Sequence, residues 1–373
     1  MSEDGRKSKF QLNFKVQRTH SKFNLLLTKT MSSFAAIPPY PPSTPGAENK
    51  AGTFWPNLSS QTAVALSEVE KWFYENNLQI ADLALEFVDP KLILLRYLRA
   101  NNLDVKKTIA HIEKNIQWRK EMNVLEIMKM TPEQILGCDM PALTKVFPHW
   151  HFGFDKTGRP VIYKQYGKFD ASHVKTLTGG SYDNVVKYHI WEQENCLRMC
   201  MRKTAETGHL VETISGIVDV KDMRMFQITR DFLNLTKQIA DVDQHQYPET
   251  LGRIYIINTP TVFPMVWRLV KPWLDPIVTA KIFIFGGPKE YEPALIEFIG
   301  KDNLPSNYGG TQPALNCNVH PYAETLRDFY GNGDALQSGS MKRKDSSELT
   351  DTSSVLESES AEDAEVMMFA NGL

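Results

Sequence analysis

The sequence lacks the motifs that define several classes of enzyme active site. It has no G-x-S-x-G nucleophile motif, no G-x-x-x-x-G-K-[ST] phosphate loop and no H-E-x-x-H zinc motif. Two glycine pairs, Gly179-Gly180 and Gly286-Gly287, stand alone, and an isolated pair does not specify a phosphate-binding loop. No catalytic residue is therefore predicted, and the sequence does not indicate an enzyme.

Cysteine is scarce, with 4 residues in 373. Cys138, Cys196, Cys200 and Cys317 show no disulfide framework, which is typical of a reducing compartment. His189, Cys196 and Cys200 are spaced seven and four residues apart, so they would share one helix face, as metal ligands can. Because no fourth ligand accompanies them, we predict buried thiols and no metal site.

An excess of one charge and long apolar runs are also missing. Lys and Arg number 42 against 44 Asp and Glu, so nucleic acid is disfavoured as a partner and any anionic partner must meet a local cluster. No run reaches the roughly 20 apolar residues of a transmembrane helix, and no stretch resembles a secretory signal. We therefore expect a soluble intracellular protein.

The most distinctive stretch that is present is an apolar run of helix length, residues 261–274. Only Arg268 and Lys271 carry charge within it, so the predicted helix has no polar face. Pro264 and Pro272 lie too close together for a membrane span between them. The helix is therefore expected to be buried in protein or to cover something apolar.

Two β-rich runs, residues 253–258 and 281–285, flank this helix. Strands joined through a helix form a parallel, centrally buried pair, so a helix-covered sheet is already accounted for. An additional apolar helix suits a movable wall over a lipid-sized cavity. An ordinary packed core helix is the alternative that composition leaves open.

The chain divides into segments of different composition. Residues 1–53, basic and Pro-rich, predict a disordered leader; a targeting segment, a membrane-surface segment or an upstream start artefact is the alternative. Residues 54–130 have helical periodicity and predict a small all-helical subdomain. Residues 140–311 predict the main domain, and residues 312–373 predict a flexible, acidic, Ser-rich tail.

Within the helical subdomain, Asp89-Pro90 and Asp104 predict helix N-termini. Four charged residues are interpreted as a solvated face: Arg96, Arg99, Lys106 and Lys107. Phosphate contact by the two arginines is the alternative.

In the main domain, residues 147–167 predict a β-hairpin that turns at residues 155–158. A long helix over residues 182–206, a strand within 210–220 and a helix over 227–244 follow. Strands that alternate with helices of ten or more residues indicate an α/β layer fold.

Two polar residues bracket the apolar helix. Glu249 precedes one flanking strand and Lys281 begins the other, so both are placed at the rim of one sheet. An acceptor beside a cation suits a hydroxylated, phosphate-bearing head group. A solvated ion pair, contributing at most about 1 kcal/mol, is the alternative, and the two residues alone favour it.

Seven motifs in this order resemble the CRAL-TRIO lipid-transfer family, and specifically its phosphatidylinositol/phosphatidylcholine-transfer branch. The motifs are LLRYLRANNLDV, QWRK, DKTGRPV, GHLVETISGIVDV, YPETLGRIYIINTP, VKPWLDPIVTAKI and LPSNYGG. The resemblance covers residues 91–311 and implies a mixed sheet with helices, a deep apolar pocket for one lipid and a gating helix at residues 261–274. The residues implied for the gate and the acyl-chain pocket are Phe263, Val266, Trp267, Leu269, Val270, Trp273, Ile214 and Gly216.

The head-group positions of this branch are matched in part. Glu249 and Lys281 match residues that contact the inositol and its phosphate. Asn101 stands where the branch has an arginine, and Val278 stands where it has a phosphate-binding threonine. The implied head-group residues, including those that could compensate, are Glu249, Lys281, Thr279, Arg99 and Asn101.

The choline-lipid positions depart further from the branch, because its paired serine and threonine are here Ile214 and Gly216. The resemblance therefore implies a non-enzymatic carrier that binds one phospholipid, phosphatidylinositol rather than phosphatidylcholine, and exchanges it between membranes. The lipid is cargo, and no cofactor is implied.

The carrier is expected to be a cytoplasmic monomer in transient contact with endomembranes such as Golgi or endosomes. One alternative is a lipid-sensing regulator of phosphoinositide signalling or membrane trafficking, with a protein partner bound through the acidic tail. Another is a carrier of a different hydrophobe, such as a sterol or tocopherol.

Overall fold

The computed structural model describes residues 52–55, 57–84 and 90–316. The predictions for the chain before residue 52 and after residue 316 lie outside these residues, as does the predicted cap at Asp89. No helix among the described residues combines the length and the apolarity that crossing a membrane requires.

Helices make up the first part of the described chain. They are α2 (Ser60–Glu75), η3 (Ile80–Asp82), α3 (Pro90–Ala100), α4 (Val105–Glu121), α5 (Val124–Ile127), α6 (Pro132–Leu136) and α7 (Met140–Val146). The predicted cap at Asp104 is confirmed, because its Oδ1 accepts a hydrogen bond from the Lys107 N–H at 3.0 Å.

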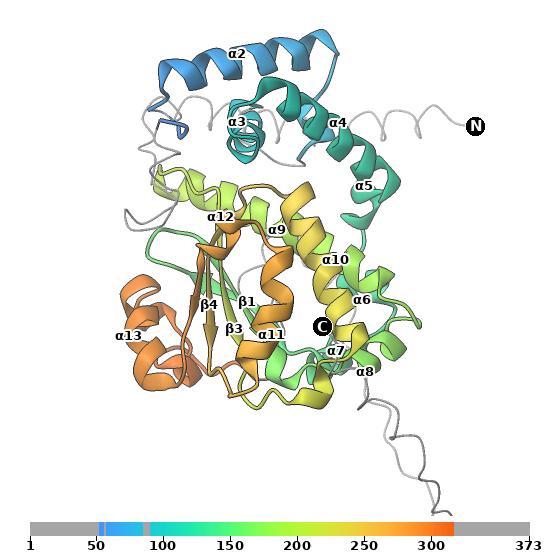
Figure 1. Cartoon of the computed structure of the whole chain (residues 1–373), viewed down its shortest axis with the longest axis vertical. Coiled ribbons are helices and arrows are strands. Elements are labelled where there is room, and N and C mark those ends of the chain that lie inside the picture. The colour runs from blue at the N-terminus through green and yellow to red at the C-terminus, as the bar shows by residue number, and fades with distance from the viewer. Residues whose placement is uncertain (1–51, 56, 85–89, 317–373) are drawn as a thin grey trace, which may run out of the picture. The chain divides into compact units, whose positions relative to one another are not determined.

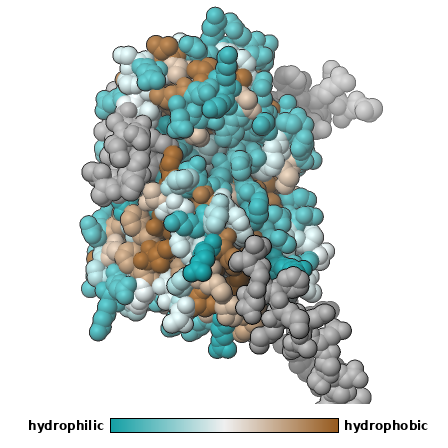
Figure 2. Space-filling model, in the orientation of Figure 1, coloured by the Kyte–Doolittle hydropathy of each residue, from teal (hydrophilic) through white to brown (hydrophobic). Residues whose placement is uncertain are grey.

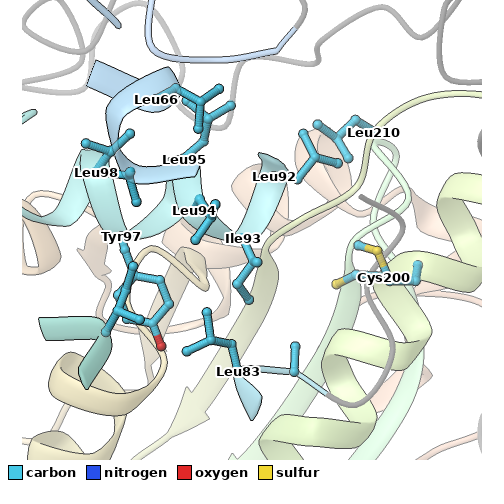
Figure 3. Packing of buried hydrophobic residues seen from close by; sticks show 14 of the residues in the cluster. Leu66, Leu83, Leu92, Ile93, Leu94, Leu95, Tyr97, Leu98, Cys200 and Leu210 are labelled. Carbon is cyan, nitrogen blue, oxygen red and sulfur yellow. The ribbon is translucent and has the colours of Figure 1, made fainter. Parts of the chain in front are cut away.

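Helix α3 lies at the centre of the first hydrophobic core. Every residue from 92 to 99 is buried, so α3 packs on all sides. Figure 3 shows its leucines among Leu66 of α2, Leu210 and Cys200, which belong to the same cluster. This core therefore joins the helical part of the chain to the α/β part.

Five strands form one mixed sheet in the order β1-β2-β3-β4-β5. They are β1 (His149–Phe154), β2 (Pro160–Gln165), β3 (Ile214–Asp219), β4 (Leu251–Ile257) and β5 (Ile282–Ile284). β1 and β2 are antiparallel, which confirms the predicted hairpin, and the remaining pairs are parallel, as predicted for β4 and β5. Asp155 fixes the hairpin turn, because its Oδ1 accepts hydrogen bonds from Thr157 N at 2.8 Å and Arg159 N at 3.0 Å.

Helices cover both faces of this sheet (Figure 1). The remaining helices of the described chain are η4 (Tyr166–Lys168), α8 (Ala171–Leu177), α9 (Asp183–Thr207), η5 (Met225–Gln227), α10 (Arg230–Gln246), α11 (Phe263–Val270), η6 (Lys271–Trp273), α12 (Pro276–Thr279), α13 (Pro288–Phe298), η7 (Lys301–Asn303) and η8 (Ser306–Tyr308). Figure 1 places α13 on one side of the sheet and α10 and α11 on the other. The predicted long helices correspond to α9 and α10, and the predicted thiols of Cys196 and Cys200 are buried in α9.

The two faces of the sheet differ in how completely they are covered. Tyr163, Ile217 and Tyr255 are aligned across β2, β3 and β4 and are buried in the second core, which contains Leu295 of α13. Successive residues of a strand point to opposite faces, so Ile162, Gly216, Ile254 and Ile282, also in register, share the other face. Of these four, only Ile162 is buried.

Candidate functional site

The segment predicted as one helix over residues 261–274 is divided in the structure. Helix α11 ends at Val270, the short helix η6 contains Pro272, and α12 begins at Pro276. Proline lacks the N–H that a continuing helix needs, so the α-helix ends before Pro272. Asp275 caps α12 by accepting the Ile277 N–H at 2.7 Å.

Helix α11 is buried on one side only. Phe263 and Val266 are buried, whereas Met265 is 38% exposed and Leu269 is 43% exposed. Trp267 is half-buried and stacks on Phe263 with ring centroids 6.4 Å apart. The outer apolar face of this helix therefore meets solvent, which does not fit the alternative of an ordinary packed core helix.

The C-terminal end of this apolar segment is fastened to α10. Gln244 of α10 donates from Nε2 to the Trp273 carbonyl at 3.0 Å and accepts the Asp275 N–H at 2.7 Å. Val270 and Trp273 are both half-buried there. The Gln244 side chain of α10 thus holds the backbone between η6 and α12 in place.

The face of the sheet opposite α13 is apolar and only partly covered. Ile214 is buried, whereas Gly216, Ile254 and Ile282 are half-buried. A Cβ at Gly216 would have its nearest neighbour, Ile254 Cγ1, at 3.4 Å, which is ordinary van der Waals contact. Figure 2 shows hydrophobic residues reaching the surface in the region of β4 and α11, which suits a site for an apolar ligand.

Glu249 and Lys281 meet at the rim of this face, as their positions in the sequence predict. Lys281 is 3% exposed, and its Nζ lies 3.5 Å from Oε2 of Glu249, whose side chain is 9% exposed. Glu249 adopts a positive φ of 57° just before β4, which turns the chain into the strand. The pair is buried, so the solvated interpretation is wrong for this structure.

The other head-group candidates lie in different settings. Thr279 ends α12 two residues before Lys281, and its hydroxyl donates to the Pro276 carbonyl at 2.9 Å. Asn101 follows α3; its Nδ2 donates to the Tyr97 carbonyl at 2.8 Å and lies 3.0 Å from His111 Nδ1. Thr279 is therefore the candidate that the chain brings beside Lys281.

Arg96 and Arg99 are buried, which corrects their interpretation as a solvated face. Arg96 donates to the Thr250 hydroxyl at 3.1 Å and to the Glu212 carbonyl at 2.6 Å. Arg99 forms an ion pair of 2.9 Å with Glu212 and donates to the Thr53 carbonyl at 3.3 Å. These arginines fasten α3 to the segments that lead into β3 and β4, whereas Lys106 and Lys107 are exposed as predicted.

A buried polar network on α9 had no signal in the sequence motifs. Glu192 accepts from His151 Nε2 at 2.9 Å and from Lys164 Nζ at 3.3 Å, and it lies 3.5 Å from His189 Nδ1. Although burial raises the pKa of the Glu192 carboxyl, Lys164 and these imidazoles together hold it well below its usual range. Lys164 shares the partly covered face of the sheet with Val218 and Ile256, so this network is part of that face.

His189 connects this network to α10 and makes stability depend on pH. Its Nε2 lies 2.6 Å from Asp243 Oδ1; burial lowers the pKa of His189, but Asp243 and Glu192 raise it overall to about 9. Because the pKa of His189 is higher in the folded than in the unfolded protein, protonation of His189 stabilises the fold. This stabilisation is fully present below pH 6.5, the unfolded pKa, and is lost as the pH rises through about 9, the folded pKa. In urea unfolding we expect the free energy of unfolding to fall by on the order of 2–3 kcal/mol between these two pH values.

In this pH experiment, His189→Gln should remove most of the decline, whereas His209→Gln, at an exposed position, should retain it. A wild-type decline that persists in His189→Gln would contradict the assignment.

Comparison with known proteins identifies the domain. Residues 145–310 match the model of the CRAL/TRIO domain. The chain is 33% identical over 270 residues to the "SEC14 cytosolic factor" of Eremothecium gossypii, which covers 72% of this chain and 82% of that protein.

Two further matches differ in coverage. The chain is 31% identical over 240 residues to "Phosphatidylinositol/phosphatidylcholine transfer protein SFH12" of Arabidopsis thaliana, which covers 64% of this chain and 42% of that protein. A solved structure, "Crystal structure of Sfh5", matches with a TM-score of 0.48 and 21% identity over 64% of this chain and 84% of that chain.

The matched family model spans the sheet, α9, α10 and α11, which are the elements that hold the candidate site. The SEC14 relative matches over 270 residues, a longer stretch than the family model covers. The chain therefore belongs to the CRAL/TRIO family, in the branch of the SEC14-like phosphatidylinositol/phosphatidylcholine transfer proteins.

Proposed function

We propose that the protein binds one phospholipid, phosphatidylinositol, and exchanges it between membranes. The observation that carries this proposal is the partly covered apolar face of the sheet with α11 beside it. The acyl chains lie along this face, near Ile214 and Gly216, and α11 forms the outer wall. Relatives named as phosphatidylinositol/phosphatidylcholine transfer proteins support the same cargo class.

Exchange requires no bond to break. The protein replaces the bilayer as the solvent of the acyl chains, which is worth about 0.8 kcal/mol for each buried CH₂ group. Release into water would forfeit that energy, so α11 must open while it contacts a membrane. Its exposed residues Met265 and Leu269 provide an apolar surface for this contact.

The head group is held at the rim by Glu249, Lys281 and Thr279. Lys281 supplies a cation for the phosphate, and the carboxylate of Glu249 accepts hydroxyl groups of the inositol ring. Their separation of 3.5 Å exceeds the roughly 2.7–2.9 Å of a strong charge-assisted hydrogen bond, so a phosphate oxygen can compete for the Lys281 ammonium group.

Inositol lipid is favoured over choline lipid by two residues of β3. Ile214 and Gly216 offer no side-chain hydroxyl where the branch has a serine and a threonine. A choline-lipid phosphate would find no hydrogen-bond donor from either side chain. We propose that the carrier acts in the cytosol and reaches membranes peripherally, as the name of its SEC14 relative suggests.

Transfer between vesicles tests this proposal. The wild-type protein should accelerate movement of labelled phosphatidylinositol from donor to acceptor vesicles in proportion to its concentration. Met265→Ser/Leu269→Ser should slow transfer by about tenfold, because the open helix loses apolar contact with the bilayer. Both residues are exposed, so the free energy of unfolding should change by less than about 1 kcal/mol.

Leu125→Ser is the matched control, since Leu125 is an exposed leucine on α5, away from α11. It should transfer lipid at the wild-type rate. No acceleration of transfer by the wild-type protein would overturn the proposed function.

A further inference from the structure

The loop between β3 and α10 exposes two adjacent large hydrophobic side chains. Phe226 is 73% exposed and Met225 is 54% exposed, although Met223, two residues earlier, is buried. Both exposed residues belong to the short helix η5. An aromatic and a methionine presented together to solvent are typical of an interaction surface.

Hydrogen bonds to the segment at residues 167–169 hold this loop in place. Gln227 donates from Nε2 to the carbonyls of Gly167 and Phe169 at 3.1 and 3.3 Å, and its Oε1 accepts the Arg224 N–H at 2.7 Å. The Lys221 carbonyl lies so close to Gly167 that a Cβ there would come within 1.7 Å of it. The backbone that carries Phe226 is therefore held by hydrogen bonds on both sides of this residue.

Basic residues outnumber acidic ones in this loop and in the segments packed against it. The charged residues of the loop and of the segments packed against it are Lys168, Lys175, Lys221, Arg224 and Arg230, with Asp170, Asp222 and Asp231. Asp231 lies 3.4 Å from Lys175, and Asp170 caps α8 by accepting the His173 N–H at 3.0 Å. In the described part of the chain, Lys168, Lys221, Arg224 and Arg230 form no ion pair, so the surface is locally positive.

The loop and α11 leave the sheet at the same edge. Val220 donates to the Ile257 carbonyl at 3.1 Å, and Asn258 donates to Asp219 Oδ1 at 2.9 Å, so the carboxyl ends of β3 and β4 are joined. From these ends the chain continues into η5 and α10, and into α11 (Figure 1). The exposed pair and the first turn of α11 therefore lie at one end of the molecule.

We propose that Met225 and Phe226 insert into a membrane surface and that Lys168, Lys221, Arg224 and Arg230 bind the anionic lipids around them. Apolar side chains ringed by cations fit an interface with hydrocarbon below anionic head groups. The inference rests on the proposed function in that a carrier must meet a bilayer. It adds a second contact, separate from α11, that selects anionic membranes.

Sedimentation with vesicles tests this inference on the full-length protein. Wild-type protein should bind phosphatidylcholine vesicles containing phosphatidylserine more tightly than phosphatidylcholine vesicles alone. Met225→Ser/Phe226→Ser should weaken binding to the anionic vesicles by about tenfold or more, because the two apolar side chains that insert into the membrane are lost. Lys221→Glu/Arg224→Glu should abolish the preference for anionic vesicles.

Matched controls carry the same changes on the helical part of the chain. Leu125→Ser and Lys106→Glu/Lys120→Glu alter exposed residues and should bind as the wild type does. Loop variants that bind anionic vesicles as tightly as wild type would overturn the inference, as would a wild-type protein that binds neither kind of vesicle.

Lipid transfer is measured separately on the same preparations. Loop-dependent binding without transfer would overturn the proposed function and leave this inference standing. Lipid transfer together with vesicle binding that the loop variants do not weaken would overturn this inference and leave the proposed function standing. Binding of a soluble protein partner to the loop, with vesicle binding unaffected by the loop variants, would also count against a membrane.

Discussion

Replacing Lys281 by methionine should reduce phosphatidylinositol transfer by at least about tenfold. The variant keeps most of the side-chain volume and removes the ammonium group that we assign to the lipid phosphate, and one charge-assisted hydrogen bond is worth about 1.5–3 kcal/mol. Lys281 is 3% exposed, so this charge acts where solvent screens it little. The rate of transfer between vesicles measures the effect.

Loss of the fold must be separated from loss of the head-group contact. Lys281→Met alone breaks the buried pair with Glu249, and breaking such a pair costs about 3–5 kcal/mol. Glu249→Gln/Lys281→Met removes both charges and should restore most of the stability while transfer remains slow. Lys301→Ala, at an exposed lysine of η7, is the control. Wild-type transfer by the double variant would refute the assigned head-group site.

Replacing Arg99 by methionine should lower the free energy of unfolding by about 3–5 kcal/mol. The Arg99 ion pair with Glu212 is buried on both sides, with side chains 2% and 7% exposed. Removing the guanidinium leaves the Glu212 carboxylate buried and also releases the Thr53 carbonyl. Chemical denaturation at neutral pH measures the loss.

Two further variants identify the cause. Arg99→Met/Glu212→Gln should be more stable than Arg99→Met, because the unpaired charge is gone. Lys106→Ala, at an exposed position on α4, should change the free energy of unfolding by less than about 0.5 kcal/mol. A cost below about 1 kcal/mol for Arg99→Met would show that the buried pair does not fasten α3 as described.

The elements that local chemistry specifies were predictable from the sequence. The turn at Asp155 and the cap at Asp104 depend on side chains that bond to backbone groups a few residues away, and both are confirmed. The parallel pairing of β4 with β5 was also predicted, because it follows from two β-rich runs joined through a helix. The motif order predicted the family.

The burial of charged side chains was not predictable in the same way. Arg96 and Arg99 find their partners at Thr250 and Glu212, more than a hundred positions along the chain, and no local pattern indicates such pairs. The network around Glu192 likewise joins β1, β2, α9 and α10. Burial of Lys281 beside Glu249 depends on how β4 and β5 pack at the rim of the sheet. The periodicity of the sequence does not show this packing.

The burial of helix α11, the proposed gate, was also not fully predictable from the sequence. Composition predicted a helix without a polar face, and the structure buries only the side that carries Phe263 and Val266. Sequence alone does not say which side of an all-apolar helix packs against protein. The exposed side, with Met265 and Leu269, is the part that the proposed membrane contact requires.

The most direct test of the central claim is mass spectrometry of the lipid bound to the wild-type protein after incubation with mixed membranes. The account predicts one phosphatidylinositol for each protein molecule, and its loss in Glu249→Gln/Lys281→Met. Phosphatidylcholine, a sterol or no lipid at all in the wild-type protein would contradict the account.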